Sequence, residues 1–234
     1  MCRSSRTCSL LPEDTTTWSR RAPLMPPGWF AESAQAFRDA LEAAVAGDLA
    51  GSAEHLARCR GEEMSAYYIE HAQNAHRYRV RGLGTTSASG ERSTAERYPK
   101  RLEPEVMERD GFRCRFCGVP VVLRRAQDRM NALVGDDVFP MGRTNATRHG
   151  VRLCLTATMD HVEPHGRGGG SGLDNLVTAC TACNYGKGRH SLEALGLEDP
   201  RDREPVVTGW DGGLRLLPDA AQTGRRSDRT SRPC

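Results

Sequence analysis

The sequence contains no long apolar run and few aromatic residues. Hydrophobic residues make up 38% of its 234 positions and aromatic residues 6%, below the ~45–50% apolar share of ordinary globular chains. No apolar stretch approaches the ~18–20 residues that cross a bilayer, which argues against a membrane protein. The basic start, Met1-Cys2-Arg3, is followed by polar residues, so we expect no secretory signal. The sequence therefore predicts a cytoplasmic protein with much of its length in tails, linkers or solvated surface.

Lysine is nearly absent: Lys100 and Lys187 are the two lysines of the sequence. Subtracting these two from the 33 basic residues leaves 31 arginines. The net charge of +3 is too small to establish a nucleic-acid partner, and an arginine excess is typical of GC-rich genomes. Arginine nevertheless suits forked contacts with phosphate where it lies on a binding face.

The sequence also lacks the cysteine spacing of a disulfide framework, although nine cysteines are present. Four of them form two close pairs, Cys114-x-x-Cys117 and Cys180-x-x-Cys183. Two intervening residues let both sulfurs reach one ion, and four thiolates complete a tetrahedral zinc shell. Such an ion has no open position, so we predict a structural zinc; free thiols in a core are the alternative.

The residue pattern divides the chain into five parts. Residues 1–28 mix Ser, Thr, Arg and Pro and predict a disordered tail. Residues 29–82 have a helical apolar period, broken at Gly47-Asp48, which predicts a helical hairpin and one longer helix. Residues 83–97 have the composition of a flexible linker, residues 98–196 carry the chemistry, and residues 197–234 predict an irregular tail.

A second group of polar residues lies between the two cysteine pairs. A β-prone run over residues 153–159 leads into Asp160-His161. Glycines follow, then Asn175, and Asn184 comes directly after the second cysteine pair. An Asp-His pair alone is a weak indication of function. Its position between the two halves of a predicted zinc site, with Asn175 and Asn184 following in order, makes the whole set of residues a specific sequence signal.

Taken in order, these motifs resemble those of the HNH endonucleases. The resemblance is to the zinc-stabilised branch with Asn as the final metal ligand, and it covers roughly residues 98–196. It rests on residues 109–118, 160–164, 168–169, 174–177 and 180–188. It implies an α+β fold of the ββα-metal type, in which a β-hairpin and a helix hold one catalytic divalent ion beside the four-cysteine zinc site.

The resemblance also implies roles for single residues. His161 would be the general base, a task for which an imidazole with a pKa near ~6.5 suits neutral pH. Asp160 and Asn184 would hold the ion through oxygen atoms, as Mg²⁺ or Mn²⁺ prefers. Asn175 would order the loop and orient His161; an ordinary turn residue is the alternative.

Two features depart from the family's pattern. Some members carry a further His four residues after the final ligand, where this chain has Gly188, so we expect the ion to be held loosely without DNA. The connection between Cys117 and Asp160 is also longer than the usual hairpin connection. This longer connection predicts an insertion at about residues 124–152. The insertion either recognises DNA or is only an added segment at the surface.

Three cations flank the predicted site. Lys187, Arg189 and Arg167 are expected to meet backbone phosphates, with ordinary solvated cations as the alternative. Residues 29–80 show no catalytic pattern; they could form a homodimer, bind a protein partner or touch DNA.

The sequence therefore predicts a metal-dependent HNH endonuclease that hydrolyses DNA phosphodiester bonds, with a nick as the elementary product. One alternative is a zinc-stapled nucleic-acid-binding module without catalysis. Another is an RNA-directed nuclease, because no residue pattern separates DNA from RNA, where the 2′-OH would be the distinguishing contact. No membrane partner is expected.

Overall fold

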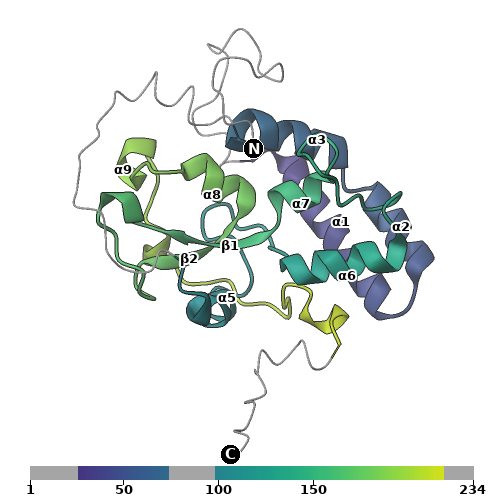
Figure 1. Ribbon diagram of the computed structural model, residues 1–234. Helices are drawn as coiled ribbons and strands as arrows, with labels where there is room; N and C mark the ends of the chain where they lie inside the picture. Colours follow the sequence, from purple (N-terminus) through teal and green to yellow (C-terminus); the bar gives the residue numbers. More distant parts are fainter. Residues whose placement is uncertain (1–25, 74–97, 219–234) are drawn as a thin grey trace, which may run out of the picture.

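The computed structural model describes residues 26–73 and 98–218 (Figure 1). The first stretch forms α1 (Gly28–Val45), α2 (Leu49–Ala57), α3 (Gly61–Tyr67) and a π-helical turn (Tyr68–Gln73). The second forms α5 (Glu103–Arg109), α6 (Arg124–Val134), α7 (Gly150–Cys154), β1 (Ala157–His161), β2 (Leu176–Cys180), α8 (Thr181–Lys187) and α9 (Leu192–Leu195). Residues 1–25, the predicted linker 83–97 and residues 219–234 lie outside the described residues.

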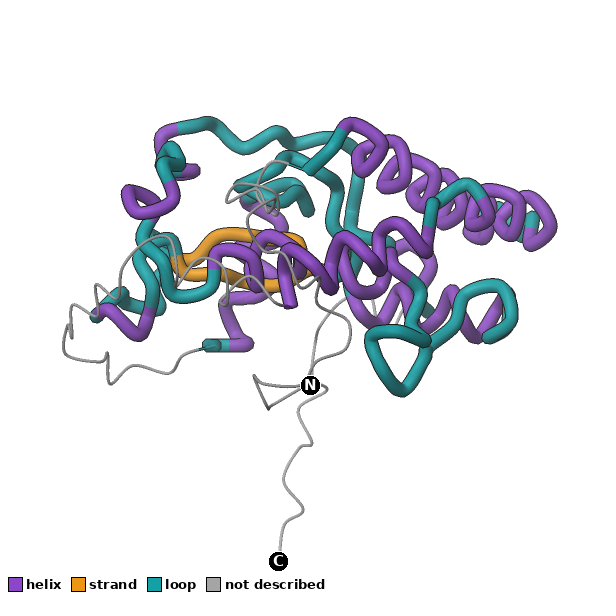
Figure 2. Tube along the Cα trace, turned by 90° about the horizontal axis from the view of Figure 1, so that it is seen from above, coloured by secondary structure: helices purple, strands orange, loops and turns teal. Residues whose placement is uncertain are grey.

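A two-stranded antiparallel hairpin lies near the middle of the molecule (Figure 2). Asp160 of β1 is opposite Val177 of β2, and His161 is opposite Leu176. The helix α8 begins directly after β2, because Cys180 is its N-cap and accepts a hydrogen bond at Sγ from the Cys183 amide at 3.4 Å. Two strands followed by a helix, among described residues whose other regular elements are helical, confirm the predicted α+β fold class.

The first three helices follow from local sequence signals. Residues 28–45 bury one apolar face, which includes Phe30 and Phe37. The chain turns at Gly47, whose φ of 82° is in the region that favours glycine, and Asp48 caps α2 by accepting from the Gly51 amide at 2.8 Å. The longer helix expected within residues 29–82 was predicted to continue past residue 73, and that part of the prediction lies outside the described residues.

The stretch predicted as an insertion packs against these N-terminal helices. The helix α6 contacts α1 and α2, and α7 contacts α3. In the loop between α6 and α7, Phe139 stacks on Phe37 of α1, with ring centroids 5.2 Å apart. Residues 124–152 therefore join the N-terminal helices to the hairpin, a role that sequence analysis did not anticipate.

The crossing of α3 and α7 is unusually close because both helices have a glycine at the contact. A Cβ atom on Gly150 would lie 2.2 Å from the Gly61 carbonyl oxygen and 2.7 Å from the Ser65 amide nitrogen. Two side chains add hydrogen bonds across the same contact, because Cys154 Sγ donates to the Met64 carbonyl at 3.2 Å and Ser65 Oγ to the Arg148 carbonyl at 3.3 Å.

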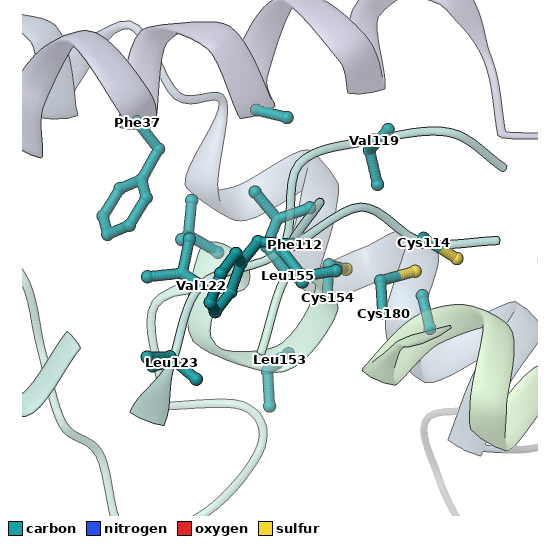
Figure 3. Packing of buried hydrophobic residues seen from close by; sticks show 14 of the residues in the cluster. Phe37, Phe112, Cys114, Val119, Val122, Leu123, Leu153, Cys154, Leu155 and Cys180 are labelled. Atoms are coloured by element: carbon teal, nitrogen blue, oxygen red, sulfur yellow. The ribbon is translucent and has the colours of Figure 1, made fainter. Parts of the chain in front are cut away.

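One hydrophobic core extends through both described stretches. Figure 3 shows part of it. Phe37 of α1 lies above Val122 and Leu123, the two residues that precede α6. The described part of the predicted irregular tail, residues 197–218, contains only short helical turns besides loops, yet it contributes to this core. Trp210 is 3% exposed, and its Nε1 donates to the Val121 carbonyl at 2.9 Å. In the described residues, no helix is long and apolar enough to cross a membrane.

Candidate functional site

The four paired cysteines come together at the joint between the hairpin and α8. The sulfurs of Cys114, Cys117, Cys180 and Cys183 all lie within 4.8 Å of one another. The first pair is in a tight turn, in which the Cys114 amide donates to the Val119 carbonyl at 2.9 Å. Figure 3 shows Cys114 and Cys180 at one edge of the core with their sulfurs turned to the same side.

The spacing of the sulfurs fits a tetrahedral zinc ion. Sulfurs held about 2.3 Å from a common zinc lie about 3.8 Å from one another, and Cys117 Sγ is 3.9 Å from Cys180 Sγ. Burial and the neighbouring sulfurs raise the pKa of Cys183 well above its ordinary value. Ionisation of Cys183 is therefore favoured only with a cation among the sulfurs, and the four-sulfur donor set fits zinc.

The second group of residues is positioned by the packing of α8 on β1. Asn184 Nδ2 donates to Thr158 Oγ1 at 3.0 Å and to the Met159 carbonyl at 3.2 Å. Thr158 and Asp160 are two residues apart on a strand, so their side chains share one face of the hairpin. The structure thus brings Asn184 and Asp160 to the same face, as the predicted ligand pair requires.

The carboxylate of Asp160 is almost fully buried. Its residue is 8% exposed, and Oδ1 accepts from the His161 amide at 2.9 Å. Oδ2 lies 3.3 Å from Lys187 Nζ but has no hydrogen bond within the described residues. Burial raises the pKa of Asp160 to about 6, although the Lys187 ammonium acts in the opposite direction. A buried carboxylate oxygen without a hydrogen bond is an acceptor that a divalent cation fits.

His161 ends β1 with its ring in a cluster of polar and aromatic side chains. It is 3% exposed, and Nε2 is 2.9 Å from Ser171 Oγ. The ring centroid of His165 lies 5.3 Å away and that of Tyr98 lies 6.2 Å away, both nearly edge-to-face. Sequence reasoning missed Ser171 and Tyr98, because neither has a motif of its own and both reach His161 only through the fold.

Asn175 ties together the two ends of the loop between β1 and β2. Its Oδ1 accepts from the Glu163 amide at 2.8 Å, and its Nδ2 donates to the carbonyls of Glu163 at 3.0 Å and Gly170 at 2.7 Å. A Cβ atom on Gly169 would lie 2.0 Å from the Glu163 carbonyl oxygen, so this approach requires glycine. The closed loop carries Ser171 to the ring of His161.

The three predicted phosphate-binding cations lie in different environments. Lys187 is 0% exposed, and its Nζ donates to the His161 carbonyl at 2.7 Å. It therefore faces inward, unlike the surface cation that the sequence suggested, because its helix packs directly on β1. Arg189 is exposed, and its Cδ would lie 3.9 Å from a Cβ on Gly166 in the hairpin loop. Arg167 is half-buried in that loop, with Nε 3.7 Å from Glu163 Oε1.

A comparison with protein families gives one match. Residues 148–190 fit the sequence model of a family described as HNH endonuclease. The matched segment spans α7, the hairpin and α8, and includes Asp160, His161, Asn175, Asn184 and the second cysteine pair. No curated protein and no solved structure matches the chain significantly. The family resemblance noted from the sequence is thereby confirmed for this segment.

Proposed function

We propose, from the HNH endonuclease domain that this chain contains, that the protein is a metal-dependent endonuclease hydrolysing DNA phosphodiester bonds one strand at a time. The observation that carries the proposal is that Asp160 and His161 end β1, and that α8, which carries Asn184, is hydrogen-bonded to this strand through the Met159 carbonyl at 3.2 Å. Oxygen donors and an imidazole are the groups needed to bind a divalent ion and to activate water.

His161 is proposed as the general base. It takes a proton from the attacking water while the water oxygen forms a bond to phosphorus and the bond to the leaving ester oxygen breaks. The Ser171 hydroxyl, 2.9 Å from Nε2, holds the imidazole ring in one orientation. Asn175 acts on His161 indirectly, because its three hydrogen bonds keep the loop that carries Ser171 closed.

Asp160 and Asn184 are proposed to hold Mg²⁺ or Mn²⁺, which supplies positive charge next to the phosphate. Lys187 supports the carboxylate from the buried side, where its Nζ is 3.3 Å from Oδ2. The structural zinc proposed for the four cysteines is separate from the chemistry; it fixes the joint from which α8 begins. Arg167 and Arg189 are proposed to contact phosphates on either side of the cut.

Nicking of supercoiled plasmid tests this proposal. The wild-type chain is assayed with and without Mg²⁺ or Mn²⁺, beside His161→Ala and the matched variant His55→Ala, which removes a histidine of α2 away from the hairpin. We expect nicking to need the ion and to fall by roughly 100-fold or more in His161→Ala, with zinc content unchanged. Equal nicking by His161→Ala and the wild type would refute the assignment of the base.

Two further measurements, DNA binding and cleavage of labelled single strands, separate the two alternatives. A zinc-loaded wild-type chain that binds DNA without cutting it in either ion is a binding module. A chain that cuts a labelled RNA strand but not the DNA strand of the same sequence is an RNA-directed nuclease.

A further inference from the structure

Lys187 is one of the two lysines in the sequence, and the fold encloses its side chain completely. It is three residues after Asn184 on α8, so the two side chains share one side of the helix. Asn184 Nδ2 donates to the Met159 carbonyl at 3.2 Å, and Lys187 Nζ donates to the His161 carbonyl at 2.7 Å. The same helix face therefore holds both Asn184 and Lys187 against β1.

The ammonium group of Lys187 has a single acidic neighbour among the described residues. That neighbour is Asp160, whose Oδ2 lies 3.3 Å from Nζ. Lys187 is 0% exposed, so its charge cannot turn outward to water unless α8 separates from β1. One buried positive charge is therefore fixed beside one buried carboxylate.

The proposed metal site shares this carboxylate with Lys187. Asp160 Oδ2, which lies 3.3 Å from the ammonium, is also the oxygen that has no hydrogen bond within the described residues. A divalent ion bound there would repel the ammonium, and this repulsion is strong in a buried environment of low dielectric constant. In the part of the chain that the structure describes, Asp160 belongs to no group of three or more Asp, Glu, His or Cys ligands that would add negative charge.

We propose that Lys187 sets how strongly the site binds its divalent ion, because its ammonium is a resident cation that keeps this ion weakly held. The proposal rests on the proposed function, in which Asp160 and Asn184 are the ligands. The sequence suggested a loosely held ion because Gly188 stands where some HNH endonucleases have a further histidine. The buried ammonium is a second and independent cause. Weak binding makes occupancy of the site depend on the free concentration of the ion.

The direction of the effect separates this role from a purely structural one. If Lys187 only held α8 on β1, its removal would leave the ligands less well ordered and would weaken metal binding. If its charge repels the ion, its removal leaves the site more negative and strengthens metal binding. Metal affinity therefore distinguishes the two roles by the sign of its change.

Titration of the full-length, zinc-loaded chain with Mn²⁺ at about pH 8 tests the proposal without requiring cleavage. Free Mn²⁺ is measured by electron paramagnetic resonance. Lys187→Met removes the charge and keeps an unbranched side chain, whereas Lys187→Gln removes the charge and keeps an N–H donor. Lys100→Met is the matched control, because it makes the same change at the other, exposed lysine. Lys187→Met combined with Asp160→Asn removes the shared carboxylate as well.

We expect both Lys187 variants to bind Mn²⁺ roughly 10- to 100-fold more tightly than the wild type, with zinc content unchanged. Lys100→Met should bind Mn²⁺ like the wild type. The gain should disappear when Asp160→Asn is added, because the ammonium and the ion meet at that carboxylate.

Thermal unfolding gives a second measurement that remains useful if the variants are less stable. Removal of Lys187 leaves a buried carboxylate unpaired, so we expect a lower Tm in the absence of Mn²⁺. A ligand that binds the folded chain more tightly raises Tm more. The rise in Tm on adding Mn²⁺ should therefore be larger in both Lys187 variants than in the wild type.

Mn²⁺ affinity in both Lys187 variants equal to or weaker than that of the wild type would overturn the proposal, as would a gain that persists after Asp160→Asn. Its failure is distinguishable from failure of the proposed function. Plasmid nicking by the wild type, together with Lys187 variants that bind Mn²⁺ no more tightly, removes the role of Lys187 and keeps the nuclease. Tighter binding that depends on Asp160, in a chain that never cuts, removes the nuclease and keeps the role of Lys187.

Discussion

At the scale of single residues, Asp160 is an acidic group in a buried environment. Its carboxyl group is buried against His161 and Lys187, and burial raises its pKa to about 6 in spite of the lysine. The ordinary value for the group is 3.8. The ionised form is therefore disfavoured until a further cation arrives, so the metal binding that we propose for Asp160 would be coupled to the loss of a proton.

This coupling predicts how metal binding depends on pH. A divalent ion needs the ionised carboxylate, and protons compete for it as the pH falls through about 6. Below that pH we expect the apparent affinity for Mn²⁺ to fall by about tenfold per unit. Titration of free Mn²⁺ by electron paramagnetic resonance at several pH values measures it. Asp174→Asn, a change in the loop between β1 and β2, should leave the profile in place. An affinity that stays constant down to about pH 5 would contradict the assignment of Asp160.

The cysteine cluster gives a second prediction at this scale. Cys183→Ser removes one of four sulfurs, and the remaining three cannot close the tetrahedral shell that we propose for zinc. We expect about one zinc per chain in the wild type, little zinc in the variant and a lower Tm. Cys59→Ser is the matched control, because Cys59 is also a fully buried thiol but lies outside the cluster. Elemental analysis and thermal unfolding measure both quantities; equal zinc in the two variants would exclude the cluster as the site.

The site residues that were predictable from the sequence are those whose chemistry is local. Cysteine pairs and the Asp160-His161 dipeptide have fixed spacings, so they could be recognised before the fold was known. The contact of Ser171 with His161 depends on a loop that Asn175 closes, and the burial of Lys187 depends on how α8 docks. Neither contact leaves a sequence pattern.

At the scale of elements, the close crossing of α3 and α7 joins the N-terminal helices α1 to α3 to the part of the chain that contains the β1–β2 hairpin. Gly150→Ala places a Cβ atom against backbone atoms of α3. We expect it to lower the free energy of unfolding by about 1–3 kcal/mol, as overpacking does in well-packed cores. Gly209→Ala is the control, since nothing lies within 4 Å of that Cβ position. Urea unfolding measures the difference, and equal midpoints for the two variants would show that the helices can separate without cost.

The elements themselves were only partly predictable. The hairpin and α8 follow from residues 157–187, where strand pairing and helix initiation are set within a short stretch. The helices that pack against α6 and α7 could not be predicted in this way, because they lie far away along the chain. The stacking of Phe139 on Phe37 is one example of such a distant contact. Periodicity identifies an apolar face but not the distant face that covers it.

At the scale of the whole molecule, the N-terminal helices and the hairpin unit share one buried cluster. Figure 1 shows α1, α2, α6 and α7 side by side on one half of the molecule and the hairpin with α5, α8 and α9 on the other. The sequence suggested a helical segment joined by a linker, which gives no indication of so extensive a contact.

The shared core predicts the behaviour of a severed chain. A protease site inserted within residues 83–97, the predicted linker, would cut the chain between the two described stretches. We expect the two pieces to co-elute in gel filtration without denaturant, because separation would expose the apolar surfaces around Phe37 and Phe139. Pieces that elute separately and remain folded would show that the two stretches are independent.

Cys180 has three structural roles: it is the last residue of β2, it is the N-cap of α8, and its sulfur belongs to the cysteine cluster. Inhibition by chelators is therefore expected to follow two time courses. Withdrawal of the divalent ion proposed at Asp160 should stop the proposed cutting at once, and added Mg²⁺ should restore it. Withdrawal of the zinc proposed for the cysteine cluster should be slow, should loosen the start of α8, which carries Asn184, and should not be reversed by Mg²⁺.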